Sequence, residues 1–127
     1  MLELVGWEKL EGYTPQETVD ELEIIDLEEG DGEVVQEGAT VTAHYTGALA
    51  KNGTIFQSSR DLGEPIEFPL SGVIEGWTEG VPGMKVGGTR RLIIPAEKAY
   101  GETGSPPSIG PNEPLVFDIE LTAVQNP

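Results

Sequence analysis

The chain has 127 residues, of which 37% are hydrophobic, and its formal net charge is −16 because seven Lys and Arg stand against 23 Asp and Glu. This length suits one domain with its own core, and so negative a surface is repelled by nucleic acids and anionic membranes. There is no Cys, which excludes disulfides and thiolate metal sites.

Residues 1–20 are expected to form an N-terminal extension packed on a domain at residues 21–127. Apolar residues such as Trp7, Leu10 and Tyr13 make this segment too hydrophobic for a solvated tail, whereas Thr14-Pro15 interrupts any long element. We expect an extra edge strand or a cover on the domain; the alternative is a partner-binding segment.

The start of the chain, Met1-Leu2-Glu3-Leu4, lacks the basic region of a signal peptide. No stretch approaches the ~18 apolar residues of a membrane span. We therefore expect a cytoplasmic monomer that binds neither membrane nor nucleic acid. The acidity fits plain solubility or adaptation to salt.

From residue 21 onward, apolar and polar residues alternate with the period of two that indicates β-strands. Residues 41–47, 66–70 and 115–123 are predicted antiparallel strands with one solvated face. On the last of these, Ala123 is expected to share the apolar face with Leu121. Residues 22–27 and 90–95 are predicted to add two strands.

One segment is predicted to be a short core helix. Ile74, Trp77 and Val81 are spaced to share one helical face, but Gly76 and Gly80 each cost about 1 kcal/mol relative to Ala. Packing against the sheet must therefore hold this helix. Beyond it, residues 101–114 form a long loop stiffened by Pro, which we expect to be a shaped wall of a site.

Large aromatic residues next to small or β-branched ones recur in four distant stretches, at residues 44–47, 73–77, 99–101 and 115–118. Brought together, they would form a dry pocket with a few polar tips, suited to a rigid apolar ligand such as a proline ring. The alternative for each aromatic is an ordinary core position. His44 should point away from such a pocket, and no second His or Cys joins it in a metal site.

These stretches resemble the FKBP-type peptidyl-prolyl isomerases, in unbroken order from about Glu21 to Gln125. The matching motifs are Val41–Gly47, Ile55-Phe56, Ser58–Asp61, Val73–Trp77, Gly80–Gly88, Ala99–Gly101 and Leu115–Leu121. The resemblance implies an α+β fold in which a twisted antiparallel β-sheet wraps around one short α-helix. It also implies an isomerase, without cofactor or metal, that rotates X–Pro bonds in proline-containing polypeptides and so assists protein folding.

The resemblance assigns roles to individual residues. Trp77 would be the pocket floor, while the Tyr100 hydroxyl and the Ile74 backbone N–H would each bind a substrate carbonyl. The walls and the overhang would be Tyr45, Phe56, Ile66, Val73, Ile74, Phe117, Ser105 and Ile109. With Gln57 at the rim, the expected catalytic residues are Tyr45, Phe56, Gln57, Ile74, Trp77, Tyr100 and Phe117.

At the rim the chain departs from the family pattern. Gln57 stands where most active members carry an Asp, and Leu62 stands where many carry the Arg that pairs with it. Losing both together avoids leaving an uncompensated charge. In addition, Ile66 replaces a usual aromatic, Ser105 replaces the His of some members, and the connection between residues 70 and 73 is about two residues shorter than usual.

These departures lead us to expect retained but reduced activity and weak binding of the macrolides tacrolimus and rapamycin. One alternative is a module that binds proline segments or a partner protein in the same pocket with negligible turnover. A chaperone is a further alternative, but it usually needs an inserted domain, which this sequence does not contain.

Overall fold

The computed structural model describes residues 10, 13–16, 18–58, 65–101, 103–104, 109 and 112–126, except for the side chains of Gln57 and Ser58. These residues form a six-stranded antiparallel sheet and one α-helix, which confirms the expected fold class. The elements are β1 (Glu23–Glu28), β2 (Thr40–Leu49), β3 (Ile55–Ser58), β4 (Ile66–Pro69), the 3-10 helix η3 (Leu70–Gly72), α1 (Glu75–Gly80), β5 (Thr89–Ile94), the 3-10 helix η4 (Ala96–Lys98) and β6 (Leu115–Gln125).

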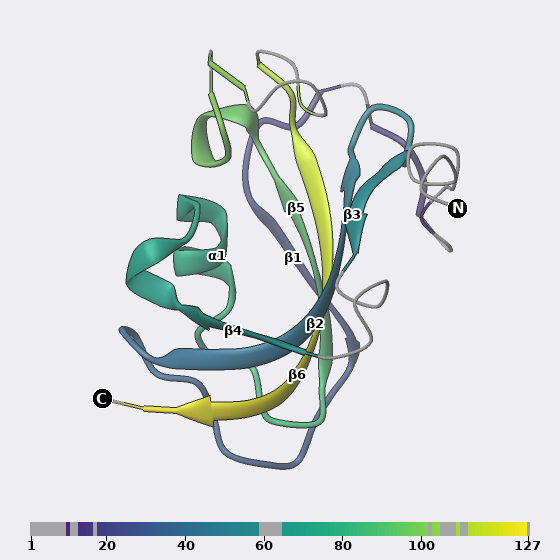
Figure 1. Cartoon of the computed structure of the whole chain (residues 1–127). Helices are drawn as coiled ribbons and strands as arrows, with labels where there is room; N and C mark the ends of the chain where they lie inside the picture. The colour runs from purple at the N-terminus through teal and green to yellow at the C-terminus, as the bar shows by residue number, and fades with distance from the viewer. Residues whose placement is uncertain are drawn as a thin grey trace.

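The sheet bends around α1 (Figure 1), with the strand order β1-β5-β6-β2-β3 and with β4 paired to β2. Strand β2 shows the predicted alternation: Val41, Ala43 and Tyr45 are buried, whereas Thr42 and His44 are only half-buried. Because successive side chains of a strand point to opposite faces, one face of β2 lines the core and the other carries the polar residues. His44 therefore lies on the opposite face from Tyr45.

Strand β6 contains a β-bulge that changes one expected position. Thr42 pairs with Ala123, but the next residue of β2, Ala43, pairs with Leu121, so Thr122 is an extra residue. The prediction that Ala123 continues the apolar face is wrong: Ala123 is exposed, and Val124 packs against the main core instead. An inserted residue shifts the alternation of side chains by one position.

Helix α1 lies very close to β5, and glycine makes this possible. A Cβ atom on Gly76 would lie 2.6 Å from side-chain atoms of Ile94, and one on Gly80 would lie 2.7 Å from Leu92 Cδ2. Both neighbours are fully buried. The two glycines that disfavour the helix by propensity therefore allow its close packing on the sheet.

Arg90 joins this helix to the edge of the sheet. Its Nη1 donates to the Gly80 carbonyl at 2.8 Å, at the end of α1, and its Nε donates to Asp26 on β1 at 2.7 Å. A cation at a helix C-terminus satisfies carbonyls that have no partner within the helix. Arg90 therefore fixes the end of α1 against β5 and β1.

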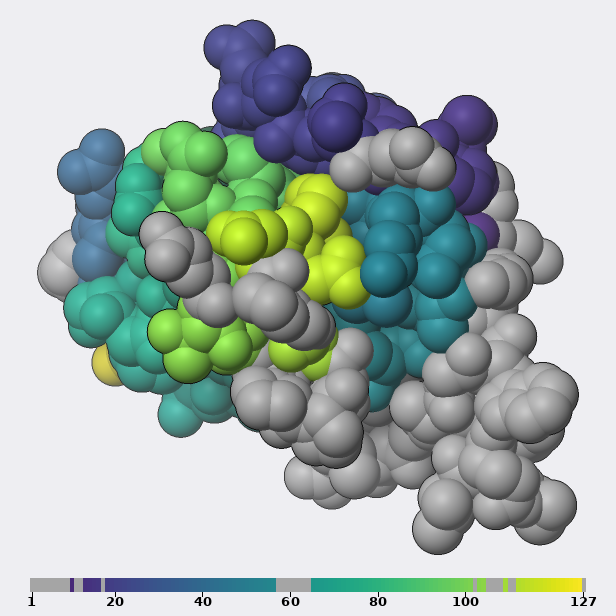
Figure 2. Space-filling model, turned by 90° about the horizontal axis from the view of Figure 1, so that it is seen from above, coloured from purple at the N-terminus to yellow at the C-terminus, as the bar shows by residue number. Residues whose placement is uncertain are grey.

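A second, smaller apolar cluster lies on the other face of the sheet, where Leu10, Ala48, Ile93 and Val116 are buried together. Leu10 N–H donates to the Gly53 carbonyl at 2.8 Å, and the Tyr13 hydroxyl donates to the Ala50 carbonyl at 2.7 Å. Figure 2 shows the described N-terminal residues, in purple, beside the teal β2–β3 segment. The division into an extension and a domain stays a prediction.

The described helices are short, and none of them is long and apolar enough to cross a membrane. The α-helix among them, α1, has only six residues.

Replacing Gly76 by Ala tests the close approach of α1 to β5. The substitution gains helix propensity, but the new methyl group overlaps Ile94, so we expect the free energy of unfolding to fall by about 1–2 kcal/mol. Urea denaturation measures this change. Gly72→Ala is the control, because its Cβ would meet Pro69 Cγ at an ordinary 3.5 Å. A Gly76→Ala protein more stable than wild type would contradict this account of the packing.

Candidate functional site

A cavity of about 360 Å³ opens between α1 and the inner face of the sheet. Its described lining comes from β2, β3, η3, α1, β6 and the segments that follow η3 and η4. The lining residues are Tyr45, Phe56, Gly72, Val73, Ile74, Trp77, Tyr100 and Phe117. Most of these residues have aromatic or aliphatic side chains, as is typical of sites that bind apolar groups.

Trp77 lies at the base of this cavity and is only 3% exposed. Three rings surround its indole with edge-on geometry: Phe68 at 5.0 Å, Phe117 at 5.5 Å and Tyr45 at 5.7 Å between ring centroids. Edge-to-face pairs of this kind are favourable beyond the area they bury. The rings hold the indole in one orientation, which makes it a rigid floor.

Two phenols supply polar groups to this cavity. Tyr45 is buried on β2, and Tyr100, after η4, is 40% exposed. Burial raises the pKa of the Tyr45 hydroxyl, and the neighbouring Tyr100 phenol adds a smaller upward contribution to it. Tyr45 therefore stays protonated at neutral pH and keeps a hydroxyl proton that it can donate.

The N-terminus of α1 contributes a backbone group. Ile74 is the N-cap residue, with extended φ and ψ of −62° and 153°. Its carbonyl accepts the first helical hydrogen bonds, from the N–H groups of Trp77 at 3.0 Å and Thr78 at 3.2 Å. The Ile74 N–H precedes these bonds and has no acceptor within the helix, and Ile74 itself lines the cavity.

The structure brings most of the predicted site residues to one place: seven of the eight lining residues belong to the predicted set. Ile66 is half-buried on β4 and does not line the cavity, and Ile109 is buried in the main core. The Gln57 backbone pairs with Gly47 beside the cavity, but its side chain, Ser105 and Leu62 lie outside the described part of the chain. The functional roles of all these residues stay predictions.

Sequence reasoning missed two contributors. Gly72 lines the cavity, but nothing about a single Gly in a short connection indicates that it lies at a binding site. Phe68 supports the Trp77 ring from β4, and its period-two spacing from Ile66 was the available signal for a buried face.

No group of three or more His, Asp or Glu among the described residues is arranged to hold a metal ion. The described lining of the cavity combines aromatic and aliphatic side chains with the hydroxyls of Tyr45 and Tyr100.

Comparison with known proteins gives consistent matches. The family model described as FKBP-type peptidyl-prolyl cis-trans isomerase matches residues 32–122. An FK506-binding protein of Streptomyces anulatus is 49% identical over 107 residues, which cover 82% of this chain and 86% of that protein. The 39 kDa FK506-binding nuclear protein of Drosophila melanogaster is 47% identical over 105 residues, covering 81% of this chain but only 29% of that longer protein. The crystal structure of a peptidyl-prolyl cis-trans isomerase from Pseudomonas syringae pv. tomato aligns with a TM-score of 0.76 and 38% identity, covering 87% of this chain and 80% of that one.

The raised pKa of Tyr45 predicts a loss of stability in alkali. An unfolded Tyr loses its proton near pH 10, whereas folded Tyr45 keeps its proton to higher pH. The free energy of unfolding should therefore fall as the pH rises from about 10 through the raised pKa. Urea denaturation between about pH 8 and 11 should show a shallower fall for Tyr45→Phe than for wild type. Parallel curves above pH 10 would rule out a Tyr45 contribution.

Proposed function

Because this chain belongs to the FKBP-type peptidyl-prolyl cis-trans isomerases, we propose that the cavity above Trp77 is where it rotates X–Pro peptide bonds. The observation that carries this proposal is the ring-lined cavity with its indole floor and its few hydrogen-bond donors. A proline ring fits such a surface because it is rigid and apolar.

The reaction needs only a modest lowering of its barrier. Rotation about a peptide bond costs about 18–20 kcal/mol because the C–N bond is partly double, and X–Pro bonds isomerise over tens to hundreds of seconds. A turnover of about 10–1000 per second requires the barrier to fall by roughly 4–7 kcal/mol. Binding and desolvation can supply an effect of this size without a nucleophile or a metal.

Desolvation acts on the difference between the planar and the twisted amide. The twisted amide has lost resonance and is less polar, so a water-poor cavity disfavours the planar ground state more than the transition state. The Tyr100 hydroxyl and the Ile74 N–H then provide fixed donors for the flanking carbonyls. Both residues line the same cavity, which supports this assignment.

Gln57 modifies the rim of this site. A neutral amide can donate and accept hydrogen bonds but supplies no negative charge. We propose that activity is retained but lower than in relatives with an Asp at this position, since the apolar cavity supplies most of the effect. Two relatives are named as FK506-binding proteins, which supports macrolide binding by this chain, and we propose that tacrolimus and rapamycin bind weakly in this cavity.

The physiological role that we propose is assistance to slow, proline-limited folding steps of other polypeptides. Several relatives are much longer than this chain, as the 29% coverage of the Drosophila protein shows. A monomeric state and a cytoplasmic location stay predictions from the sequence.

Replacing Tyr100 by Phe tests the site directly. We expect the kcat/KM for isomerisation of a short X–Pro peptide to fall by about threefold to tenfold, the value of one hydrogen bond. Tyr13→Phe is the matched control, because the Tyr13 hydroxyl bonds the Ala50 carbonyl outside the cavity, and its kcat/KM should not change. An equal loss in both variants would place the effect outside the cavity.

Replacing Gln57 by Asp tests the rim. Wild type should catalyse exchange of the peptide, seen as line broadening in NMR spectra, and Gln57→Asp should raise kcat/KM and the affinity for tacrolimus several-fold. If the peptide binds wild type with no exchange, and the substitution restores none, the module that only binds proline segments becomes the better description.

A further inference from the structure

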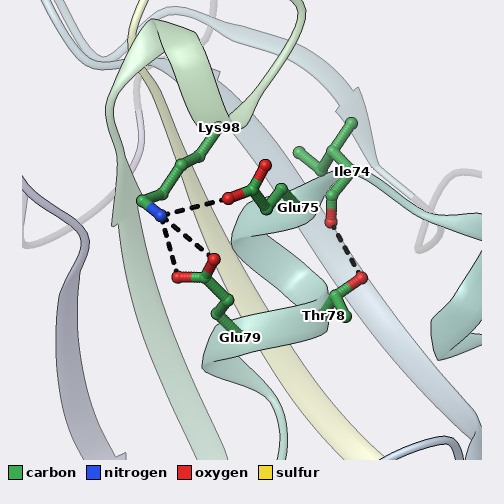
Figure 3. A network of polar contacts seen from close by, with 5 residues as sticks. All are labelled: Ile74, Glu75, Thr78, Glu79 and Lys98. Carbon is green, nitrogen blue, oxygen red and sulfur yellow. Dashed lines mark hydrogen bonds and ion pairs between the residues drawn. The ribbon is translucent and has the colours of Figure 1, made fainter.

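A single lysine connects η4 to α1. Lys98 Nζ lies 3.0 Å from both carboxylate oxygens of Glu79 and 3.2 Å from Glu75 Oε2. Figure 3 shows both carboxylates on the side of α1 that faces η4, with Thr78 on the opposite side. The side chains of Lys98, Glu75 and Glu79 are 26%, 57% and 43% exposed, so these ion pairs are open to solvent.

Two of the three residues lie next to the donors of the proposed mechanism in the sequence. Glu75 directly follows Ile74, and Lys98 is two residues before Tyr100. These ion pairs therefore join the wall that carries the Ile74 N–H to the wall that carries the Tyr100 hydroxyl.

The segment that carries Tyr100 is internally hydrogen-bonded. The Lys98 N–H donates to the Pro95 carbonyl, and the N–H groups of Ala99 and Gly101 donate to the Ala96 carbonyl, each at 2.9 Å. The backbone on either side of Tyr100 is therefore bonded to η4. A displacement of η4 away from α1 would carry Tyr100 away from Ile74.

The negative charges of Glu75 and Glu79 make a lysine necessary beside α1. Glu75 and Glu79 are four residues apart on the helix, where like charges repel, and the chain has few cations to offset its acids. The hydrogen bond from Lys98 lowers the pKa of Glu79, and the Glu79 carboxylate raises the pKa of Lys98. Both groups are therefore charged at neutral pH. Without Lys98, two carboxylates would face η4 with no counter-charge from this residue.

We propose that Lys98 is a positioning residue, whose ion pairs with Glu75 and Glu79 hold the Tyr100 hydroxyl at its working distance from the Ile74 N–H. This inference rests on the proposed function. Because exposed ion pairs are screened by salt, the arrangement makes catalysis sensitive to ionic strength through one identified bridge.

The first experiment compares Lys98→Met with wild type in the peptide isomerisation assay. At 0.1 M salt, we expect kcat/KM to fall by about threefold, the size of an exposed ion-pair network. At 1 M salt, where the Debye length is about 3 Å, the ratio of wild type to variant should approach one. Using the ratio cancels any general effect of salt on so acidic a protein.

Three further variants test whether loss of the ion pairs causes the fall in kcat/KM. Lys98→Arg keeps the positive charge and should retain most of the wild-type kcat/KM. Glu79→Gln removes the carboxylate that pairs with Lys98 and should lower kcat/KM. Lys51→Met is the matched control, since Lys51 pairs with Glu113 at 3.0 Å and neither residue lines the cavity. Its kcat/KM should equal that of wild type. Urea denaturation confirms that each variant is folded under assay conditions.

A double-mutant cycle separates positioning from simple stabilisation. If Lys98 acts through the Tyr100 hydroxyl, Lys98→Met should cost nothing further in a Tyr100→Phe protein. Losses that simply add, or a Lys98→Met protein with wild-type kcat/KM at 0.1 M salt, would overturn the inference while leaving the proposed function intact. A wild-type protein with no isomerase activity would instead overturn the proposed function, and this inference with it.

Discussion

The site depends on the close approach of α1 to β5. Gly76 and Gly80 present only hydrogen atoms to Ile94 and Leu92, so the helix backbone lies against the side chains of the sheet. This contact sets the depth of the Trp77 indole and the position of the Ile74 N–H, because both residues are carried by the same turn of chain. Arg90 secures the end of that turn by binding the Gly80 carbonyl and Asp26.

Around this contact the molecule separates an apolar interior from a strongly acidic exterior. The rings that support Trp77 come from β2, β4 and β6, so the floor is braced by three strands and cannot tilt easily. Among the described residues that line the cavity, the buried Tyr45 and the more exposed Tyr100 contribute hydroxyl groups. Since an amide that twists out of resonance becomes less polar, this division of polarity is the source of catalysis that we propose. The charged residues Lys98, Glu75 and Glu79 lie outside the cavity lining and act through the ion pairs between Lys98 and α1.

Much of the architecture was predictable from local pattern. The alternation of residues 41–47 placed Tyr45 inward and His44 outward, and the spacing of Ile74, Trp77 and Val81 located the helix that propensity disfavours. The motif order also predicted the family, which the comparisons confirm. The pattern failed at Ala123, because the β-bulge shifts the alternation of side chains by one position, and its place is set by how β6 pairs with β2.

By itself, the sequence determined which residues are apolar, how they alternate and which of them resemble a known site, because these properties depend on neighbours along the chain. Only the tertiary structure decided that Gly72 lines the cavity, that Phe68 supports the indole and that Ile109 belongs to the core. It alone also decided that Lys98 bridges to Glu75 and Glu79, residues about twenty positions away. Such contacts join segments distant in sequence, and their geometry is fixed by how the helix packs on the sheet, which no local pattern encodes.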